Sequence, residues 1–375
     1  MENSKFNLSQ IARRIAHDSL RVRSRELIWI VCGKHNIAFA EDIAAEIALS
    51  GGYPIIEVQS THVNKEVWLK APPSYLARPR KNIARMKQMV DGIVWINPVK
   101  DPCIMSDVPF ERLNLVSRAI ESEFRVFEEM QLKRVLIEYP TPEQACFYGM
   151  EFEELFEMVW GGIEIEPGYF KRIGAPLKDI LREKTQAHIT TKKGSDLKFS
   201  FDHRKMILDT GTVDEEFYLV GDPYINLPAG EIFVPPLEDS AQGILVCDEI
   251  FLEGRKIFDL RLTFEDGKIV DFSAAEGEQA FREYFENLTT PGKIIAEFGI
   301  GLNPYITKVI GMTSTDEKAF GSVHVAIGSN TYFGGRNHAD NHDDFVVQKP
   351  TLKIGDTLVL KEGKFTSPFN LEAYS

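Results

Sequence analysis

Metal-ligand residue types are concentrated near the end of the chain, between residues 297 and 344. Three of the eight histidines fall within residues 324–342. Histidine is the commonest neutral metal ligand, and carboxylates supply the negative charge that a pair of divalent ions requires. Such a group predicts a two-metal site suited to hydrolysis, because two ions can hold and activate a bridging water. The candidate ligands are Glu231, Glu297, Glu317, His324, His342 and Asp344.

Most of these residues also have an ordinary structural interpretation when each is taken alone. His324 lies in an apolar stretch, where a hydrogen-bonded core histidine is common. Glu317 could pair with its neighbour Lys318, and Glu231 could be a solvent-facing residue that opens a strand. Glu297 is different, because it follows an apolar run and a carboxylate is costly to bury there unless it meets a cation. The joint pattern therefore carries the prediction of a metal site.

The histidine–aspartate pair at the end of the group occurs in two copies. In an extended segment, residues i and i+2 point to the same face, so His342 and Asp344 can bind one ion together. His338 and Asp340 have the same spacing four residues upstream. The residue types leave both pairs open.

The elements that must position these residues fit two domains, because 375 residues exceed the roughly 150 of an ordinary domain. Residues 1–185 alternate short apolar strands with helices, which predicts an α/β domain with a mostly parallel sheet and flanking helices. Residues 186–375 predict an α+β metal-binding domain with curved or barrel-like sheets. The expected strands are 27–32, 53–58, 92–96, 135–139, 187–191, 196–201, 243–247, 256–263 and 268–272, and the expected helices are 5–22, 41–49, 116–133 and 276–288.

Composition argues against several classes of partner. The net charge of −13 argues against a nucleic-acid partner, which requires excess Lys and Arg to neutralise phosphate. No apolar run reaches the roughly 18 residues of a membrane span, so no membrane partner is expected. The four cysteines are widely spaced and are expected to be free thiols in a reducing compartment. These features predict a cytoplasmic protein.

Seven motifs resemble those of the aminopeptidase T and aminopeptidase S metallopeptidases, and together they cover most of the chain. The resemblance implies an N-terminal α/β domain, a C-terminal metal domain, a homodimer, and the removal of N-terminal residues from peptide substrates. The motifs are residues 139–145 (YPTPEQA), 195–197 (SDL), 226–231 (NLPAGE), 296–304 (AEFGIGLNP), 316–318 (DEK), 324–328 (HVAIG) and 342–346 (HDDFV).

The resemblance also implies a role for each site residue. It assigns the six candidates as ligands of two divalent ions, with Glu297 as the bridging carboxylate. The expected ions are zinc, cobalt or manganese, and Glu297 is also the candidate general base. It favours His342 over His338, because the family's pair is followed at once by two apolar residues. Tyr332 corresponds to the family's catalytic tyrosine, which would donate a hydrogen bond to the developing oxyanion. The interval from His324 to Tyr332 is one residue longer than in the family.

A second resemblance suggests a different enzyme class. Ring-cleaving dioxygenases that act on dihydroxypyridines are similar in overall sequence, and they bind a single Fe(II) through two histidines and one carboxylate. In that group a histidine replaces Glu297, and the equivalents of Glu231 and Glu317 are lost. This chain keeps all three carboxylates, which favours hydrolysis. A non-peptidase hydrolase and a non-catalytic binding protein on the same fold are further alternatives.

Overall fold

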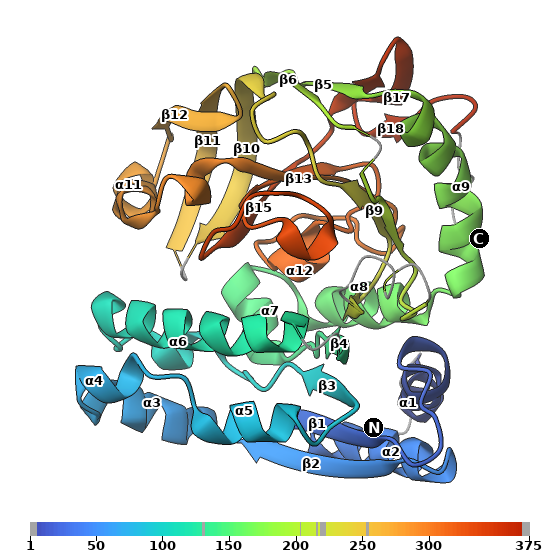
Figure 1. Cartoon of the computed structure of the whole chain (residues 1–375), viewed down its shortest axis with the longest axis vertical. Helices are drawn as coiled ribbons and strands as arrows, with labels where there is room; N and C mark the ends of the chain where they lie inside the picture. The colour runs from blue at the N-terminus through green and yellow to red at the C-terminus, as the bar shows by residue number, and fades with distance from the viewer. Residues whose placement is uncertain are drawn as a thin grey trace. The chain divides into compact units, whose positions relative to one another are not determined.

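The chain divides into two compact units, each with its own sheets (Figure 1). The computed structural model describes residues 6–129, 132–202, 204–214, 217, 223–252 and 255–369. One unit holds residues 1–164 and 211–228, and the other holds residues 165–210 and 229–375. The polypeptide therefore passes from one unit to the other three times, whereas the sequence predicts a single boundary after residue 185. Within the described residues, no helix is long and apolar enough to cross a membrane.

The first unit is built on a five-stranded parallel sheet, as the sequence predicts. Its strand order is β2-β1-β3-β4-β8, and every neighbouring pair is parallel. Strand β1 is buried along nearly its whole length, whereas the edge strand β2 is largely half-exposed. The strands are β1 (Leu27–Gly33), β2 (Tyr53–Gln59), β3 (Gly92–Ile96), β4 (Lys133–Ile137) and β8 (Tyr224–Leu227).

Helices flank this parallel sheet (Figure 1). The start of α7 shows how local sequence sets an element, because Thr141 and Gln144 form a reciprocal capping box there. The last strand, β8, comes from residues after the predicted boundary, and it joins this sheet by pairing with β4. The helical elements are α1 (Leu8–Arg14), η1 (Ile15–Ser19), α2 (Ile37–Leu49), α3 (Thr61–Lys70), α4 (Pro73–Leu76), α5 (Lys81–Lys87), η2 (Pro102–Met105), α6 (Phe110–Glu129), α7 (Pro142–Tyr148) and α8 (Phe152–Glu164).

The second unit contains two antiparallel sheets. The larger has the order β12-β11-β10-β6-β5-β16-β17-β18, and the smaller has the order β15-β14-β13-β9-β7. Buried and more exposed residues alternate along β5 and β6, as expected for strands with one face on a core. The strands are β5 (Gln186–Thr190), β6 (Asp196–Ser200), β7 (Ile207–Asp209), β9 (Glu231–Val234), β10 (Gln242–Leu252), β11 (Arg255–Glu265), β12 (Lys268–Ser273), β13 (Ile295–Gly301), β14 (Val323–Gly328), β15 (His342–Val347), β16 (Thr351–Ile354), β17 (Thr357–Lys361) and β18 (Lys364–Phe365).

Few helices accompany these sheets, and one of them carries a candidate ligand. The short helix α12 ends at Asp316, and the candidate ligand Glu317 is its C-cap. The mixed α/β class with a parallel sheet and separate antiparallel sheets confirms the predicted fold class. The helical elements of this unit are α9 (Pro167–Glu183), α11 (Glu278–Asn287), η3 (Pro291–Lys293), α12 (Thr313–Asp316) and η4 (Thr331–Phe333).

Candidate metal centre

One face of the smaller sheet carries five of the six candidate ligands. Directly opposed residues of antiparallel strands share a face, and so do residues i and i+2 of one strand. The register opposes Gly301 to Glu231, Gly299 to His324, Ala326 to Asp344 and Gly328 to His342. Each ligand candidate therefore faces a glycine or alanine on the neighbouring strand. These small residues leave open the space into which the long side chains extend.

Gly299 shows how little room remains around His324. A Cβ at position 299 would lie 2.1 Å from Cε1 and 2.2 Å from Nε2 of the His324 ring. Both distances are far below van der Waals contact, so only glycine leaves room for the ring at this point of strand β13. The imidazole itself is fully buried. The sequence placed this glycine next to the candidate ligands without indicating its role.

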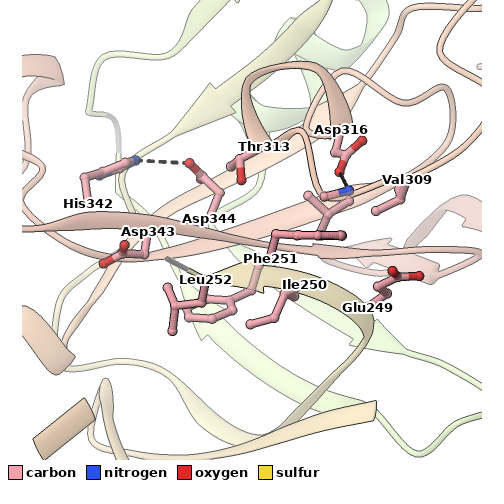
Figure 2. A pocket seen from close by; sticks show the side chains of 13 residues that line it. Glu249, Ile250, Phe251, Leu252, Val309, Thr313, Asp316, His342, Asp343 and Asp344 are labelled. Carbon is pink, nitrogen blue, oxygen red and sulfur yellow. Dashed lines mark hydrogen bonds and ion pairs between the residues drawn. The ribbon is translucent and has the colours of Figure 1, made fainter. Parts of the chain in front are cut away.

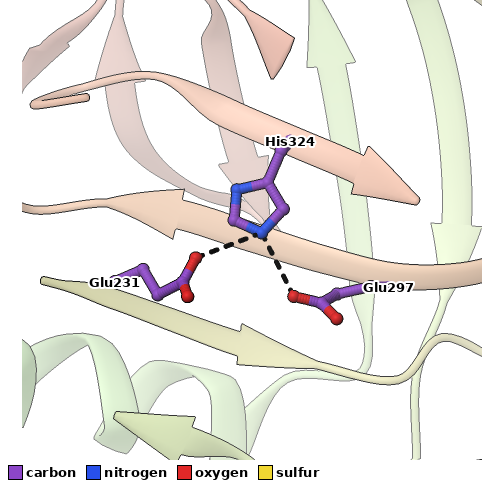
Figure 3. A group of neighbouring side chains, drawn as sticks. All are labelled: Glu231, Glu297 and His324. Carbon is purple, nitrogen blue, oxygen red and sulfur yellow. Dashed lines mark hydrogen bonds and ion pairs between the residues drawn. The ribbon is translucent and has the colours of Figure 1, made fainter. Parts of the chain in front are cut away.

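Glu297 lies between the two histidines (Figure 3). Nε2 of His324 donates a 3.2 Å hydrogen bond to Oε1 of Glu297, and the same nitrogen lies 3.4 Å from Oε2 of Glu231. The other oxygen of Glu297, Oε2, lies 3.4 Å from Nε2 of His342, and Asp344 Oδ2 is 3.8 Å from that nitrogen. Each oxygen of Glu297 therefore faces a different imidazole.

Glu317, the C-cap of α12, joins the group, and Lys318 follows it in the chain. Lys318 is completely buried, and its Nζ contacts Oε1 of Glu317 and, at 2.9 Å, Oε1 of Glu231. Burial opposes the charged ammonium, but Glu231, Glu317 and the nearby Asp209 outweigh it and raise the pKa of Lys318. Glu317 therefore both pairs with Lys318 and belongs to the cluster of candidate ligands. The adjacent charges in the sequence hinted at the pair, but the link from Lys318 to Glu231 was missed.

The rival histidine–aspartate pair lies away from the cluster. The side chains of His338 and Asp340 are exposed, whereas Nδ1 of His342 donates a 2.7 Å hydrogen bond to the carbonyl oxygen of Ser329. That bond turns Nε2 of His342 toward the carboxylates. Tyr332 lies in the short helix η4 with its ring centroid 5.6 Å from that of His342. The structure therefore brings the six ligand candidates together and puts Tyr332 beside one of them.

Close packing of charges shifts the pKa of nearly every group in the cluster. Burial opposes ionisation of Glu297, but hydrogen bonds from both histidines lower its pKa to about 2. Burial also disfavours the imidazolium form, yet the carboxylates outweigh it and raise the pKa of His324 to about 9 and of His342 to about 10. Burial raises the pKa of Glu231 to about 8 and of Asp344 to about 7. Without a metal, the cluster therefore balances its negative charge by binding protons, because the pKa values of both histidines and of two carboxylates are raised.

The donor set fits divalent cations. Metal–ligand bonds of roughly 2.0–2.2 Å place neighbouring ligand atoms about 3 to 3.5 Å apart, close to the 3.2–3.8 Å separations around the two imidazoles. The candidate atoms form three overlapping groups, each within 4.8 Å. Among the described residues, buried Oδ1 of Asp344 accepts no hydrogen bond, and buried Oε2 of Glu231 makes the 3.4 Å contact with His324 but accepts no hydrogen bond. Unsatisfied buried oxygens are costly, and a cation would satisfy them.

Several proteins of known activity are similar to this chain. A 2,5-dihydroxypyridine 5,6-dioxygenase of Pseudomonas putida is 25% identical over 53% of this chain and 59% of its own length. Aminopeptidase AmpS of Bacillus subtilis is 28% identical over 43% of each chain. The chain thus spans only about half the length of these two relatives. Aminopeptidase PepS of Streptococcus thermophilus is 22% identical over 94% of this chain and 95% of its own.

Solved structures and a family profile extend the likeness to the whole chain. Wild-type AmpT from Thermus thermophilus shares the fold with a TM-score of 0.75 at 18% identity, covering 96% of this chain and 98% of its own. A 2,5-dihydroxypyridine dioxygenase from Pseudomonas putida has a TM-score of 0.63 at 18% identity, covering 98% of this chain and 99% of its own. The profile of the thermophilic metalloprotease (M29) family, whose name implies divalent metal ions, matches residues 4–365. This chain belongs to the thermophilic metalloprotease (M29) family.

Proposed function

We propose that this protein is a metal-dependent aminopeptidase that removes N-terminal residues from peptides with the help of two divalent ions, zinc, cobalt or manganese. The observation that carries the proposal is the position of Glu297, whose two carboxylate oxygens face separate imidazoles at 3.2 and 3.4 Å. One carboxylate shared between two ligand groups supports a dinuclear centre. The full ligand set is Glu231, Glu297, Glu317, His324, His342 and Asp344.

The chain's own residues divide the work of peptide hydrolysis. Bound ions would supply an activated water and polarise the scissile carbonyl. Glu297 is proposed to take the proton from that water as general base, because its carboxylate lies between the two groups of ligands. The surplus of carboxylates favours the cationic α-amino group of a peptide. Tyr332, beside the His342 ring, is proposed to donate a hydrogen bond to the oxyanion.

The test combines metal content with turnover. Protein dialysed against zinc, cobalt or manganese is expected to hold two ions per chain and to release p-nitroaniline from aminoacyl p-nitroanilides. Glu297→Gln should reduce that turnover by several orders of magnitude. Glu286 is an exposed carboxylate on α11, so Glu286→Gln is the matched control and should leave the turnover unchanged. Retention of most turnover in Glu297→Gln is the result that contradicts the assignment.

The same experiment separates the dioxygenase alternative. Similarity to the dihydroxypyridine dioxygenases in both sequence and fold gives that alternative its support. It predicts one iron per chain, oxygen consumption with a dihydroxypyridine, and no aminopeptidase activity. The gathering of Glu231, Glu297 and Glu317 at one centre favours hydrolysis, because a single Fe(II) of the dioxygenase type uses one carboxylate.

We further propose that the enzyme is a cytoplasmic homodimer. Its four cysteines are free thiols, which supports a reducing compartment. Sedimentation of the purified protein tests the oligomeric state, and a single species with the mass of one chain contradicts a dimer.

A further inference from the structure

A cavity of about 210 Å³ adjoins the candidate metal centre (Figure 2). It lies between the second half of β10, the loop that precedes α12, and strand β15. His342 and Asp344 line it, and both also belong to the cluster. A molecule held in this cavity therefore touches the proposed metal ligands. At roughly 30 Å³ per water molecule, the volume exceeds that of several waters and suits one amino-acid side chain.

Of the other eleven residues that line the cavity, six have apolar side chains. Ile250 and Leu252 come from β10, Val309 comes from the loop, and Phe345 comes from β15. Gly311 fixes how closely the loop approaches β10. Its φ is +90°, and a Cβ there would lie 1.6 Å from the ring of Phe251, which also lines the cavity. The close approach of Gly311 to Phe251 therefore helps to set the shape of the cavity.

Other acidic residues that line the cavity already have partners. Asp316 accepts hydrogen bonds from the backbone N–H groups of Ile310, at 3.0 Å, and Gly311, at 2.6 Å. Asp343 accepts from the Tyr284 hydroxyl and from Asn341. A third carboxylate, Glu249, forms a 2.9 Å ion pair with Lys256. Glu249 is therefore paired with a cation, whereas Asp316 and Asp343 accept hydrogen bonds from neutral groups of the fold.

We propose that this cavity holds the side chain of the substrate's N-terminal residue and selects an apolar one, from leucine up to aromatic size. The inference rests on the proposed aminopeptidase function. In that reaction the scissile carbonyl belongs to the N-terminal residue, so its side chain must lie within a few bonds of the metal centre. Differences of one methylene in an apolar pocket change kcat/KM by roughly 10–200-fold. Leucyl substrates should therefore exceed alanyl substrates at least tenfold.

Two substitutions test the subsite, one that fills the cavity and one that enlarges it. Val309→Trp fills the cavity and should lower kcat/KM for leucyl p-nitroanilide at least about tenfold while alanyl p-nitroanilide changes less than about threefold. Leu252→Ala enlarges the cavity and should shift preference from leucyl toward tryptophanyl substrates. Val270→Trp, at an exposed position of β12, is the matched control and should leave the leucyl-to-alanyl ratio unchanged.

Binding of free amino acids keeps this test separate from the proposed function. Leucine should bind the metal-loaded wild type more tightly than alanine by calorimetry, and Val309→Trp should abolish the difference. If the wild type cleaves no aminoacyl substrate yet shows this preference, the peptidase proposal is wrong and the subsite stands. An unchanged leucyl-to-alanyl ratio in both folded variants, or a wild type that prefers arginyl substrates, overturns the subsite.

Discussion

Replacing Gly299 by alanine should disable the metal centre without changing any proposed ligand. The new Cβ would lie 2.1 Å from Cε1 of His324, whereas ordinary van der Waals contact begins at 3.4 Å. The ring must therefore move by about 1.3 Å, the difference between the two values. Metal sites tolerate deviations of only about 0.2 Å in their bond lengths. The displaced imidazole then cannot serve as a ligand where Glu297 and Glu231 converge.

The expected loss exceeds that of a disturbed outer contact. Changing a residue that only orients a ligand costs roughly 10–100-fold in metal affinity. Removing a ligand nitrogen should cost at least the upper end of that range, about 100-fold. Crowding the core should also cost about 1–3 kcal/mol of folding stability. The folded state should survive, because position 299 has an extended backbone that alanine can adopt.

A chelator competition assay measures the effect. The metal dissociation constant is read from the chelator concentration that removes half of the bound zinc, with thermal melting as the check on folding. Gly168→Ala is the matched control, because a Cβ at position 168, in the first turn of α9, meets nothing within 4 Å. Wild-type metal affinity in a folded Gly299→Ala protein would refute the reasoning, since His324 would then not be needed where the structure puts it.

Three further predictions concern the charges of the cluster. Lys318→Met leaves Glu231 without its buried cation. The chelator-treated variant should therefore lose roughly 3–5 kcal/mol of folding stability. An unchanged melting temperature would contradict this prediction. In that metal-free state the pKa values of His324 and His342 are about 9 and 10, above the ordinary 6.5. The two histidines therefore contribute fully to folding stability below pH 6.5, and this contribution is lost as the pH rises through 9 and 10. The melting temperature of the metal-free protein should fall across that interval, and a rise would contradict the prediction. His342→Ala should abolish binding of one metal ion per chain, whereas His338→Ala should leave metal content unchanged, as elemental analysis can decide.

The sequence predicted much of the parallel sheet, because strands buried on both faces are continuous apolar runs. Strands β1, β2 and β3 begin at the predicted residues. It did not predict that β8 would return to that sheet after the intervening segment, because strand pairing between distant residues leaves no local signal. The same limit hid Lys318, whose contact with Glu231 bridges residues far apart in the chain.

By itself, the sequence supplied the residue types of the candidate centre and the i, i+2 spacing that puts His342 and Asp344 on one face. Tertiary structure decided the rest, because strand register determines which side chains oppose one another. It set Glu297 between two imidazoles, put Gly299 beneath the His324 ring, and left His338 exposed. A single slip in register would turn these side chains to the other face. The sequence itself shows that ligand residue types are close together along the chain, whereas their convergence in space depends on strand pairing across the sheet.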